Sequence, residues 1–460
     1  MSAEVERSIP PGRVADPRAA PRPTPRDELV PAVFVGGAVV VGLLVVYLLS
    51  NLARENLYGH FLWQAQAWLQ GSTTIPYPVP ENAYYQDVMP VLDAAGRETG
   101  RGLLPFPPLP ALVLVPFVAV WGLATDAQLI SAVAAALVVG VAFWSLGRLR
   151  IRPSTRLATT LFLGLGTVLW YSAAVGSTWF FAHTVALVLV FTAVGIALAR
   201  ERADDLSWAV APRWSVDRWL VLAGFLLGVA ATARLPVVLG GVFFLFVGGG
   251  TMRRQVLSVA CGAALPLLAL AGYNLASTGH LFNPAYEYLY RYEVGAYSEL
   301  GYRAAWSIED IRYIPQNLAI MLLQPPNLRL ECLASLGAAS LFDHDCPALA
   351  PDAVGMSLLL TSPAYLLVIP AIRRRWTDPV VTGGLAATIL IATLNLMHFS
   401  QGWVQFGYRF SLDFVPFLLP VVALGLDSLT GRWRVVAWVL IGVSAAVTLW
   451  GVAWRSIYGW

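Results

Sequence analysis

The sequence lacks lysine and contains little charge, little histidine and little cysteine. All 30 of its basic residues are arginine, and only 12% of the 460 residues are charged. A soluble domain carries about a quarter of charged residues, so this composition excludes an ordinary soluble protein. Apolar runs of about 20 residues recur from Pro31 to Trp454, and each is long enough for a membrane-spanning helix. We therefore predict an all-α polytopic membrane protein.

Other features that the sequence lacks exclude further classes of protein. The apolar runs lack the alternating polarity of the roughly ten-residue strands in a membrane β-barrel. No basic patch interleaved with aromatic residues indicates nucleic-acid binding. Residues 1–29 are rich in proline and in charges of both signs, carry no secretory signal, and are predicted to be a disordered cytoplasmic tail. Residues 30–460 are predicted to form a single transmembrane domain.

The positions of the arginines predict the orientation of the spans. Arginine concentrates in the short cytoplasmic loops of membrane proteins. If every arginine cluster is cytoplasmic, the chain crosses the membrane about 11 times, from a cytoplasmic N-terminus to an external C-terminus. The clusters are Arg7–Arg26, Arg148–Arg156, Arg200–Arg218, Arg253–Arg254, Arg373–Arg375 and Arg432–Arg434.

This topology depends on two unusual stretches. Residues 103–122, "LLPFPPLPALVLVPFVAVWG", are apolar but begin with closely spaced prolines, which a regular helix does not accommodate. This stretch is therefore predicted not to cross. Residues 219–251 are too long for one span and carry Arg234 and Pro236 near the middle. Two short helices that meet at Arg234 are predicted here, because one helix would place the arginine mid-bilayer.

Two large external loops result, 51–127 and 277–354, and both are rich in polar and aromatic residues. The first opens with "ENLYGHFLWQAQAWLQG", whose apolar residues recur at helical spacing and predict a juxtamembrane helix. The second carries a tyrosine-rich run, 286–302, and a second juxtamembrane helix over 311–322. Cys332 and Cys346 also lie in the second loop, on the oxidising side of the membrane, and are disulfide candidates.

Several short motifs follow one another in a characteristic order. They are "ENLYGHFLWQAQAWLQG", "PFPPLPALVLVPFVAVWG", "ATARLP", "YNLASTGHLFNPAYEY", "YIPQNLAIMLLQPP" and "QFGYRFSLDFVPFLL". In this order they resemble the GT-C superfamily of polyprenyl-phosphate-dependent membrane glycosyltransferases, in particular the aminoarabinose transferases and bacterial members similar to protein O-mannosyltransferases. The resemblance extends over roughly residues 30–430 and implies a GT-C-like fold.

The resemblance implies an inverting hexosyl- or pentosyltransferase in a bacterial plasma membrane, with its active site on the external, periplasmic face. The donor would be a polyprenyl-phosphate-linked sugar in the bilayer. The acceptor would be a hydroxyl of a cell-envelope glycan, a lipid or a protein. The alternatives are a transporter or flippase of lipid-linked glycans, and a glycan ligase or polymerase. The absence of internal repeats and of midplane charges favours an enzyme over a transporter.

Such a transfer needs a carboxylate base for the acceptor hydroxyl. The family places acidic residues just after the first span, and Glu55 stands at the second of these positions. Arg54 occupies the first, where the family has Asp. Asp87, in "YYQDVM", is the rival base, and the sequence leaves the choice between Glu55 and Asp87 open.

The transfer also needs cations that stabilise the leaving phosphate. Arg234 and Arg409 are predicted to lie outside, against the usual distribution of arginine, and are the candidate phosphate ligands. The sequence shows no metal-ligand pattern and no motif that requires a cofactor, although a divalent metal would suit the chemistry. The candidate substrate contacts are His60, Tyr85, Tyr286 and Gln405.

Overall fold

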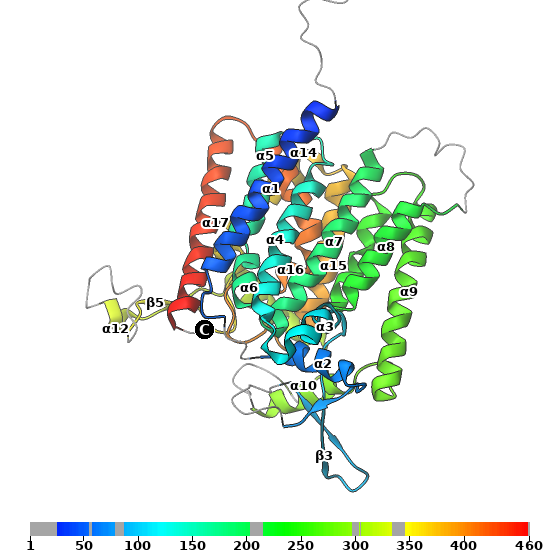
Figure 1. Cartoon of the computed structure of the whole chain (residues 1–460). Helices are drawn as coiled ribbons and strands as arrows, with labels where there is room; N and C mark the ends of the chain where they lie inside the picture. The colour runs from blue at the N-terminus through cyan, green and yellow to red at the C-terminus, as the bar shows by residue number, and fades with distance from the viewer. Residues whose placement is uncertain are drawn as a thin grey trace, which may run out of the picture.

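The computed structural model describes residues 25–54, 58–78, 87–202, 215–296, 303, 305–333 and 346–458. Within these ranges the helices form a bundle with smaller elements gathered at one end (Figure 1). Six described helices are long and apolar enough to cross a membrane, and the bent pair α5–α6 would make a seventh span. The chain is therefore a multi-pass membrane protein. These helices are α1 (Pro25–Leu49), α4 (Ala127–Leu146), α5 (Pro153–Leu165), α6 (Val168–Val175), α7 (Thr178–Arg202), α9 (Met252–Thr278), α15 (Pro379–Met397) and α17 (Gly431–Tyr458).

The predicted count of about 11 spans is not confirmed by the lengths of the helices. The arms of the predicted hairpin, α8 (Arg218–Ala231) and η3 (Leu235–Leu245), have 14 and 11 residues. A 14-residue α-helix is about 21 Å long, less than the roughly 30 Å of the hydrocarbon core. Hydropathy counts apolar residues and does not detect such breaks. The other short bundle elements are α13 (Leu358–Thr361), η7 (Pro363–Leu367), α14 (Val368–Arg375) and α16 (Ser411–Asp427).

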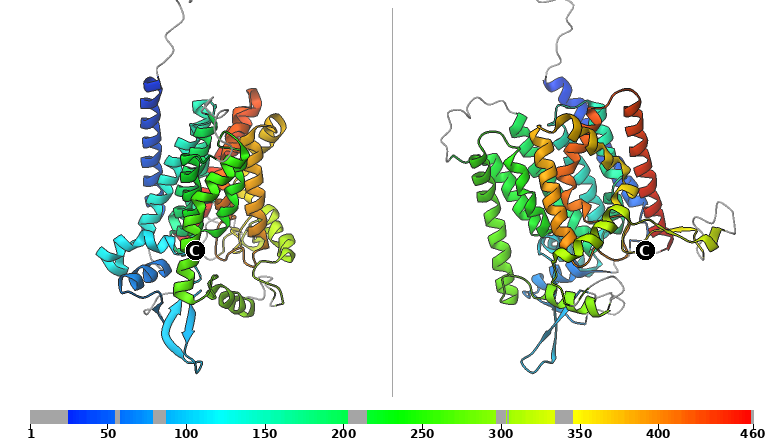
Figure 2. Two further views of the ribbon diagram at one scale, coloured as in Figure 1. Left: turned by 90° about the vertical axis from the view of Figure 1, so that its right-hand side faces the viewer. Right: turned by 180° about the vertical axis from the view of Figure 1, so that it is seen from behind.

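Hydrogen bonds between distant residues establish which helix ends share one end of the bundle. The Asn51 side chain donates to Gln128 Oε1 (3.1 Å) and to the Ala174 carbonyl (2.7 Å). The Ser456 hydroxyl donates to the Ser50 carbonyl (2.9 Å). The ends of α1, α6 and α17 and the start of α4 therefore meet at one end of the bundle, which we call the loop face (Figure 2).

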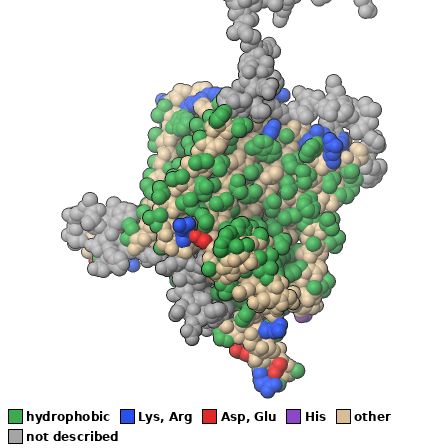
Figure 3. Space-filling view, in the orientation of Figure 1, with side chains coloured by type: hydrophobic (Ala, Val, Ile, Leu, Met, Phe, Trp, Pro, Cys, Tyr) green, Lys and Arg blue, Asp and Glu red, His purple; other side chains and the backbone are tan. Residues whose placement is uncertain are grey.

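The opposite end, which we call the arginine end, carries buried or half-buried arginine–aspartate pairs. Arg152 Nε lies 3.0 Å from Asp427 Oδ1, and Asp217 Oδ2 lies 2.8 Å from Arg200 Nη2 and 3.3 Å from Arg254 Nη2. Figure 3 shows basic side chains at this end, beyond a broad hydrophobic surface that faces outward along the bundle. All three arginines belong to the clusters that the sequence assigns to one side of the membrane.

The proline-rich stretch 103–122 begins and ends at the loop face. The Asn283 side chain donates to the Leu104 carbonyl (2.6 Å), and the Leu109 amide donates to the Thr232 carbonyl at the tip of the hairpin (3.0 Å). Its helix, α3 (Leu109–Trp121), has only 13 residues and packs beside α2 (His60–Leu69) (Figure 1). The stretch leads from this end of the bundle to α4 at the same end, so it does not cross.

The remaining elements also lie at the loop face. A three-stranded antiparallel sheet has the order β1–β3–β2, and its β2–β3 hairpin projects from the bundle (Figure 1). A two-stranded sheet, β4–β5, stands at the side of the molecule next to α12 (Figure 1). The elements are β1 (Ile75–Pro76), β2 (Met89–Leu92), β3 (Glu98–Leu103), η1 (Gly122–Ala124), α10 (Ala285–Ala296), η5 (Ile311–Tyr313), α11 (Ile314–Leu323), β4 (Asn327–Leu328), α12 (Leu330–Leu333) and β5 (Leu349–Ala350).

Glycines bring the hairpin into direct backbone contact with α9. A Cβ atom on Gly262 of α9 would lie 2.0 Å from the Val221 carbonyl oxygen of α8. A Cβ atom on Gly224 of α8 would lie 2.2 Å from the Val259 carbonyl oxygen of α9. Small residues allow such close approach between membrane helices, where van der Waals packing replaces the hydrophobic effect as the main attraction. The position of α8, and of Arg234 after it, is thereby tied to α9.

The two ends of the bundle generate a prediction about accessibility. We expect a cysteine in place of Thr99, exposed on β3, to react with a membrane-impermeant maleimide in intact cells. A cysteine in place of Arg432, exposed at the start of α17, should react only after permeabilisation, because arginine clusters mark the cytoplasmic side. Both variants carry Cys261→Ser, which removes the exposed free cysteine. Labelling of both positions from the same side would contradict the topology.

Candidate functional site

A buried carboxylate, Asp413, joins four parts of the bundle at the loop face. It lies in the first turn of α16 and is 1% exposed. Arg234, between α8 and η3, donates to both of its oxygens, from Nε at 3.0 Å and from Nη2 at 2.6 Å. The Asn395 side chain of α15 donates to Oδ2 at 3.1 Å, and His183 Nδ1 of α7 lies 3.1 Å from Oδ1. This bidentate arginine geometry is the strong form of an ion pair.

Arg409 lies nearby and has no carboxylate of its own. The side chain is 6% exposed, and its guanidinium lies over the rings of Phe180 (4.9 Å) and Phe410 (5.3 Å). Among the described residues it makes no ion pair, and its buried Nε has no hydrogen-bond partner. Burial and the neighbouring charge of Arg234 lower the pKa of Arg409 to about 10, so the guanidinium is still charged at neutral pH.

The charges of these three side chains do not cancel. Arg234 and Arg409 supply two positive charges, and Asp413 supplies one negative charge that Arg234 already engages on both oxygens. Within the described part of the chain, Arg409 is therefore a buried cation that makes no ion pair of its own, although it senses the charges of Asp413 and Asp87. An isolated buried charge is strongly unfavourable, so the arrangement favours binding of an anion at Arg409.

Two carboxylates at the loop face adjoin this site: Asp87 senses the charge of Arg409, and Glu293 senses the charge of Asp87. The Asp87 carboxylate accepts a hydrogen bond from Trp179 Nε1 at 3.0 Å, and its backbone has a φ of 66°, a conformation that Asp tolerates better than most residues. Burial raises the pKa of Asp87 to about 6. Burial and the charge of Asp87 raise the pKa of Glu293, on α10, to about 8. At neutral pH Asp87 is therefore the member of the pair that ionises.

The N-terminal turns of α7 hold all of these parts in place. Trp179 donates to Asp87, Phe180 lies under Arg409, and His183 faces Asp413. The same helix end is fixed to the loop, because the Thr178 hydroxyl contacts His60 Nδ1 at 2.8 Å. One helix end therefore positions a carboxylate, a cation and the ion pair relative to one another.

Two of the predicted substrate contacts, His60 and Tyr286, lie in surroundings that differ from each other. His60 is fully buried, and its ring packs against Trp63, Phe106 and Trp179, with centroids 5.1, 5.4 and 5.7 Å away. It is thus part of an aromatic cluster that supports Trp179. Tyr286, on α10, lies close enough to Arg234 and Asp87 to sense both charges, and burial raises its pKa to about 12.

Gln405 borders the same site as Arg409. Its Nε2 donates to the carbonyls of Gln401 (2.6 Å) and Val354 (2.8 Å), while its buried Oε1 has no partner among the described residues. A Cβ atom on Gly402 would lie 2.8 Å from Arg409 Nη2 and 3.0 Å from Gln405 Cδ. Gly402 also has a φ of 100°, so glycine is required there on two grounds.

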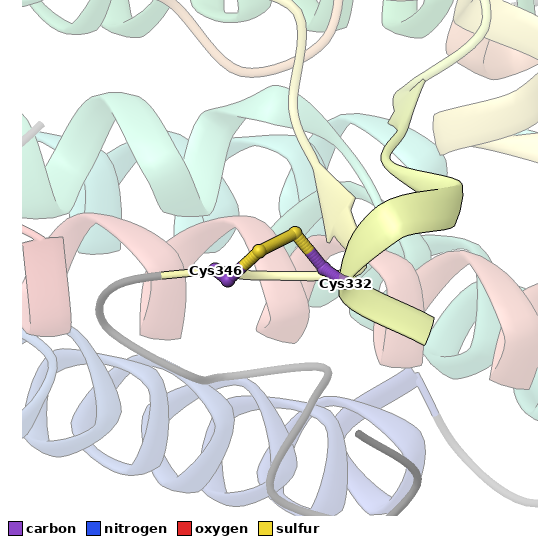
Figure 4. The surroundings of a disulfide bond; sticks show 2 residues. All are labelled: Cys332 and Cys346. Carbon is purple, nitrogen blue, oxygen red and sulfur yellow. A yellow bond between two sulfur atoms is a disulfide. The ribbon is translucent and has the colours of Figure 1, made fainter. Parts of the chain in front are cut away.

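Four other predicted residues lie outside this cluster or outside the described ranges. Glu55 and Tyr85 fall outside the described residues, so the rival base is not placed. Cys332 and Cys346 form a disulfide, with Cα atoms 5.3 Å apart, beside β4–β5 (Figure 4). No group of three or more His, Cys, Asp or Glu side chains in the described part of the chain is arranged to hold a metal ion.

Sequence reasoning missed two members of the cluster. Glu293 has a detectable signal, because it follows Tyr286 by seven residues and therefore shares its face of a helix. Trp179 has no such signal, since its contact with Asp87 joins residues 92 positions apart. The anchoring of Arg234 by Asp413 is likewise a finding of the structure, since the pair joins residues 179 positions apart.

Comparisons with known proteins give one weak match. The chain matches no protein-family model and no curated protein sequence. Among solved structures it is similar to ArnT from Cupriavidus metallidurans, which was crystallised bound to undecaprenyl phosphate. The alignment covers 93% of this chain and 76% of that chain, with 14% identity and a TM-score of 0.48. Similarity at this level carries no argument about fold or activity, so the function has to be argued from the residues of this chain.

The buried ion pair generates a prediction about stability. Asp413→Asn would leave Arg234 buried without a counter-charge, and breaking a buried pair in this way costs about 3–5 kcal/mol. Asp93→Asn is the matched control, because it breaks an exposed pair with Arg97 on the hairpin, and little change is expected. The measurement is thermal unfolding of the purified chain in detergent. Equal midpoints for the two variants would show that Asp413 is not a structural anchor.

Proposed function

We propose that this chain is a membrane glycosyltransferase with a GT-C-like fold. It would transfer a sugar from a polyprenyl-phosphate donor to an acceptor hydroxyl at the loop face. The observation that carries the proposal is Arg409, a buried cation that makes no ion pair among the described residues, beside Arg234 and close to Asp87. A site with surplus positive charge and a nearby carboxylate suits a reaction in which an anionic phosphate departs and a hydroxyl loses a proton.

The position of the charges favours an enzyme over a transporter. In transporters the substrate site lies near the middle of the membrane, between repeated halves. Here Arg234, Arg409 and Asp413 lie at the loop face, where the external loops supply Asp87 and Glu293. A lipid-linked donor would place its phosphate at this level while its polyprenyl chain stays in the bilayer.

The orientation follows from the arginine distribution. Arginine concentrates in cytoplasmic loops, so we assign the arginine end to the cytoplasm and the loop face to the external side of a bacterial plasma membrane. On this assignment the short arms α8 and η3 would each count as a crossing, as the sequence predicts. The acceptor would be a cell-envelope glycan, a lipid or a protein.

The proposed reaction is a single displacement. The acceptor oxygen attacks the anomeric carbon while its proton passes to a carboxylate base. The bond between that carbon and the phosphate oxygen breaks, and its electron pair leaves with the phosphate, which Arg234 and Arg409 stabilise. Attack opposite the leaving group inverts the configuration of the sugar. We assign the base to Asp87, because Trp179 orients its carboxylate and burial raises its pKa to about 6; Glu55 is the alternative.

Arg409 generates a prediction about lipid binding. Arg409→Ala should weaken binding of a polyprenyl phosphate by about ten- to a hundredfold, because a hydrogen bond to a charged group contributes about 1.5–3 kcal/mol. Arg312→Ala is the matched control, since Arg312 is an exposed loop-face arginine already paired with Asp310. Titration calorimetry in detergent measures both affinities. An unchanged affinity in Arg409→Ala would overturn the phosphate site and, with it, the proposed function.

Asp87 generates a prediction about catalysis and its pH dependence. Asp87→Asn should lower sugar transfer by about 10²–10⁴-fold without a comparable loss of lipid affinity, as expected for a general base. A base must be deprotonated, and burial raises the pKa of Asp87 to about 6, so the wild-type rate should rise with pH and be half-maximal near this value. Transfer of a radiolabelled sugar from its lipid carrier measures both effects. Normal transfer by Asp87→Asn together with an inactive Glu55→Gln would assign the base to Glu55.

A further inference from the structure

The His183 imidazole is buried, and one of its two ring nitrogens has no hydrogen-bond partner among the described residues. It is 1% exposed, and its Nδ1 lies 3.1 Å from Asp413 Oδ1. A carboxylate beside Nδ1 favours the tautomer with the proton on that nitrogen. Nε2 of the neutral ring is then a hydrogen-bond acceptor only. Nε2 is buried and has no hydrogen-bond partner in the described part of the chain.

His183 lies beside the two cations of the candidate site. Phe180 and His183 are three residues apart on α7 and therefore share one face of the helix. The Arg409 guanidinium lies 4.9 Å over the Phe180 ring. The Phe410 ring lies 6.3 Å from the His183 ring and 5.2 Å from the Arg234 guanidinium. The imidazole and both guanidinium groups thus surround Phe410.

The charges around His183 make its protonation depend on what is bound. The neutral ring faces two cations and one carboxylate, so the empty site disfavours a further positive charge on Nε2. A bound phosphate adds negative charge beside the ring, and a second anionic oxygen near Nε2 would need a donor where the neutral ring has an acceptor. The charged and titratable groups around the ring and its cations are Asp413, Arg234, Arg409, Asp87, Tyr171, Tyr286 and Tyr408.

The substrate and product of the proposed reaction differ in charge. A polyprenyl-phosphate sugar is a phosphodiester with one negative charge. The polyprenyl phosphate that leaves is a monoester whose second pKa is about 6, so it carries two negative charges at neutral pH. The second form therefore brings one more negative charge to the site than the first form does.

We propose that His183 takes up one proton from solvent when a phosphate monoester occupies Arg234 and Arg409, and that it stays neutral with a phosphodiester. This inference rests on the proposed function, because it needs a phosphate at the two arginines. The protonated Nε2 would donate to the additional anionic oxygen, while Nδ1 continues to face Asp413. Release of the monoester would then require loss of the same proton, so product release would become faster as pH rises.

The test counts protons during binding of farnesyl phosphate, a monoester, to the full chain in detergent. Titration calorimetry at about pH 8, where the free monoester is already a dianion, is repeated in buffers of different ionisation enthalpy. Wild type should take up about one proton per lipid, and its affinity should fall about tenfold per pH unit above neutrality. Farnesyl methyl phosphate, a diester with one charge, should bind without proton uptake.

The matched variant is His183→Asn, because the Asn amide can replace Nδ1 as the group that faces Asp413 but does not titrate. It should bind the monoester with no proton uptake and a flat pH dependence, and bind the diester as wild type does. His183→Gln provides a second non-titrating side chain if the Asn variant folds poorly. Equal proton uptake in wild type and both variants would overturn the role of His183 while leaving the proposed function intact. If wild type binds neither lipid, both proposals fail.

Discussion

The buried ion pair between Asp413 and Arg234 is the constraint on which the loop face depends. Asp413 is buried and Arg234 is 20% exposed, and their bidentate hydrogen bonds hold α16 to the α8–η3 hairpin. Asn395 and His183 bind α15 and α7 to the same carboxylate. Because removal of either partner leaves an uncompensated charge, these four elements keep their relative positions, and Arg409 remains beside them as surplus charge.

The two ends of the bundle use the same residue types in different ways. At the arginine end, Asp217 engages Arg200 and Arg254, and Asp427 engages Arg152 together with the hydroxyl of Thr155. There the arginines have partners within the chain. At the loop face Arg409 has none among the described residues and is stabilised by aromatic faces. An arginine that is paired with a carboxylate within the chain stabilises the fold. An arginine that lacks such a partner can still bind an anionic ligand.

The sequence predicted the parts of this arrangement that depend on one residue and its immediate surroundings. Arg234 at the hairpin tip and Arg409 near the start of α16 were both identifiable, because an arginine beside an apolar run is unusual. Trp179 was not, since its role depends on a contact with Asp87, 92 positions away, whereas Glu293 was missed although its spacing from Tyr286 carries a signal. The number of spans was predicted from apolar length and arginine position. The break at Arg234 was predicted as well, but α8 and η3 are each shorter than a full span, so their lengths do not confirm the count.

The glycine contact between α8 and α9 links the site to the thickness of the bilayer. α9 has 27 residues and is therefore about 40 Å long, longer than the roughly 30 Å hydrocarbon core. Such a helix adapts to a thinner or thicker membrane by tilting. Gly262 and Gly224 leave no side chain between the two backbones to absorb that tilt, so α8 moves with α9. Because Asp413 holds the same hairpin to α16, α15 and α7, we expect a change of bilayer thickness to act on this whole assembly and not on α9 alone.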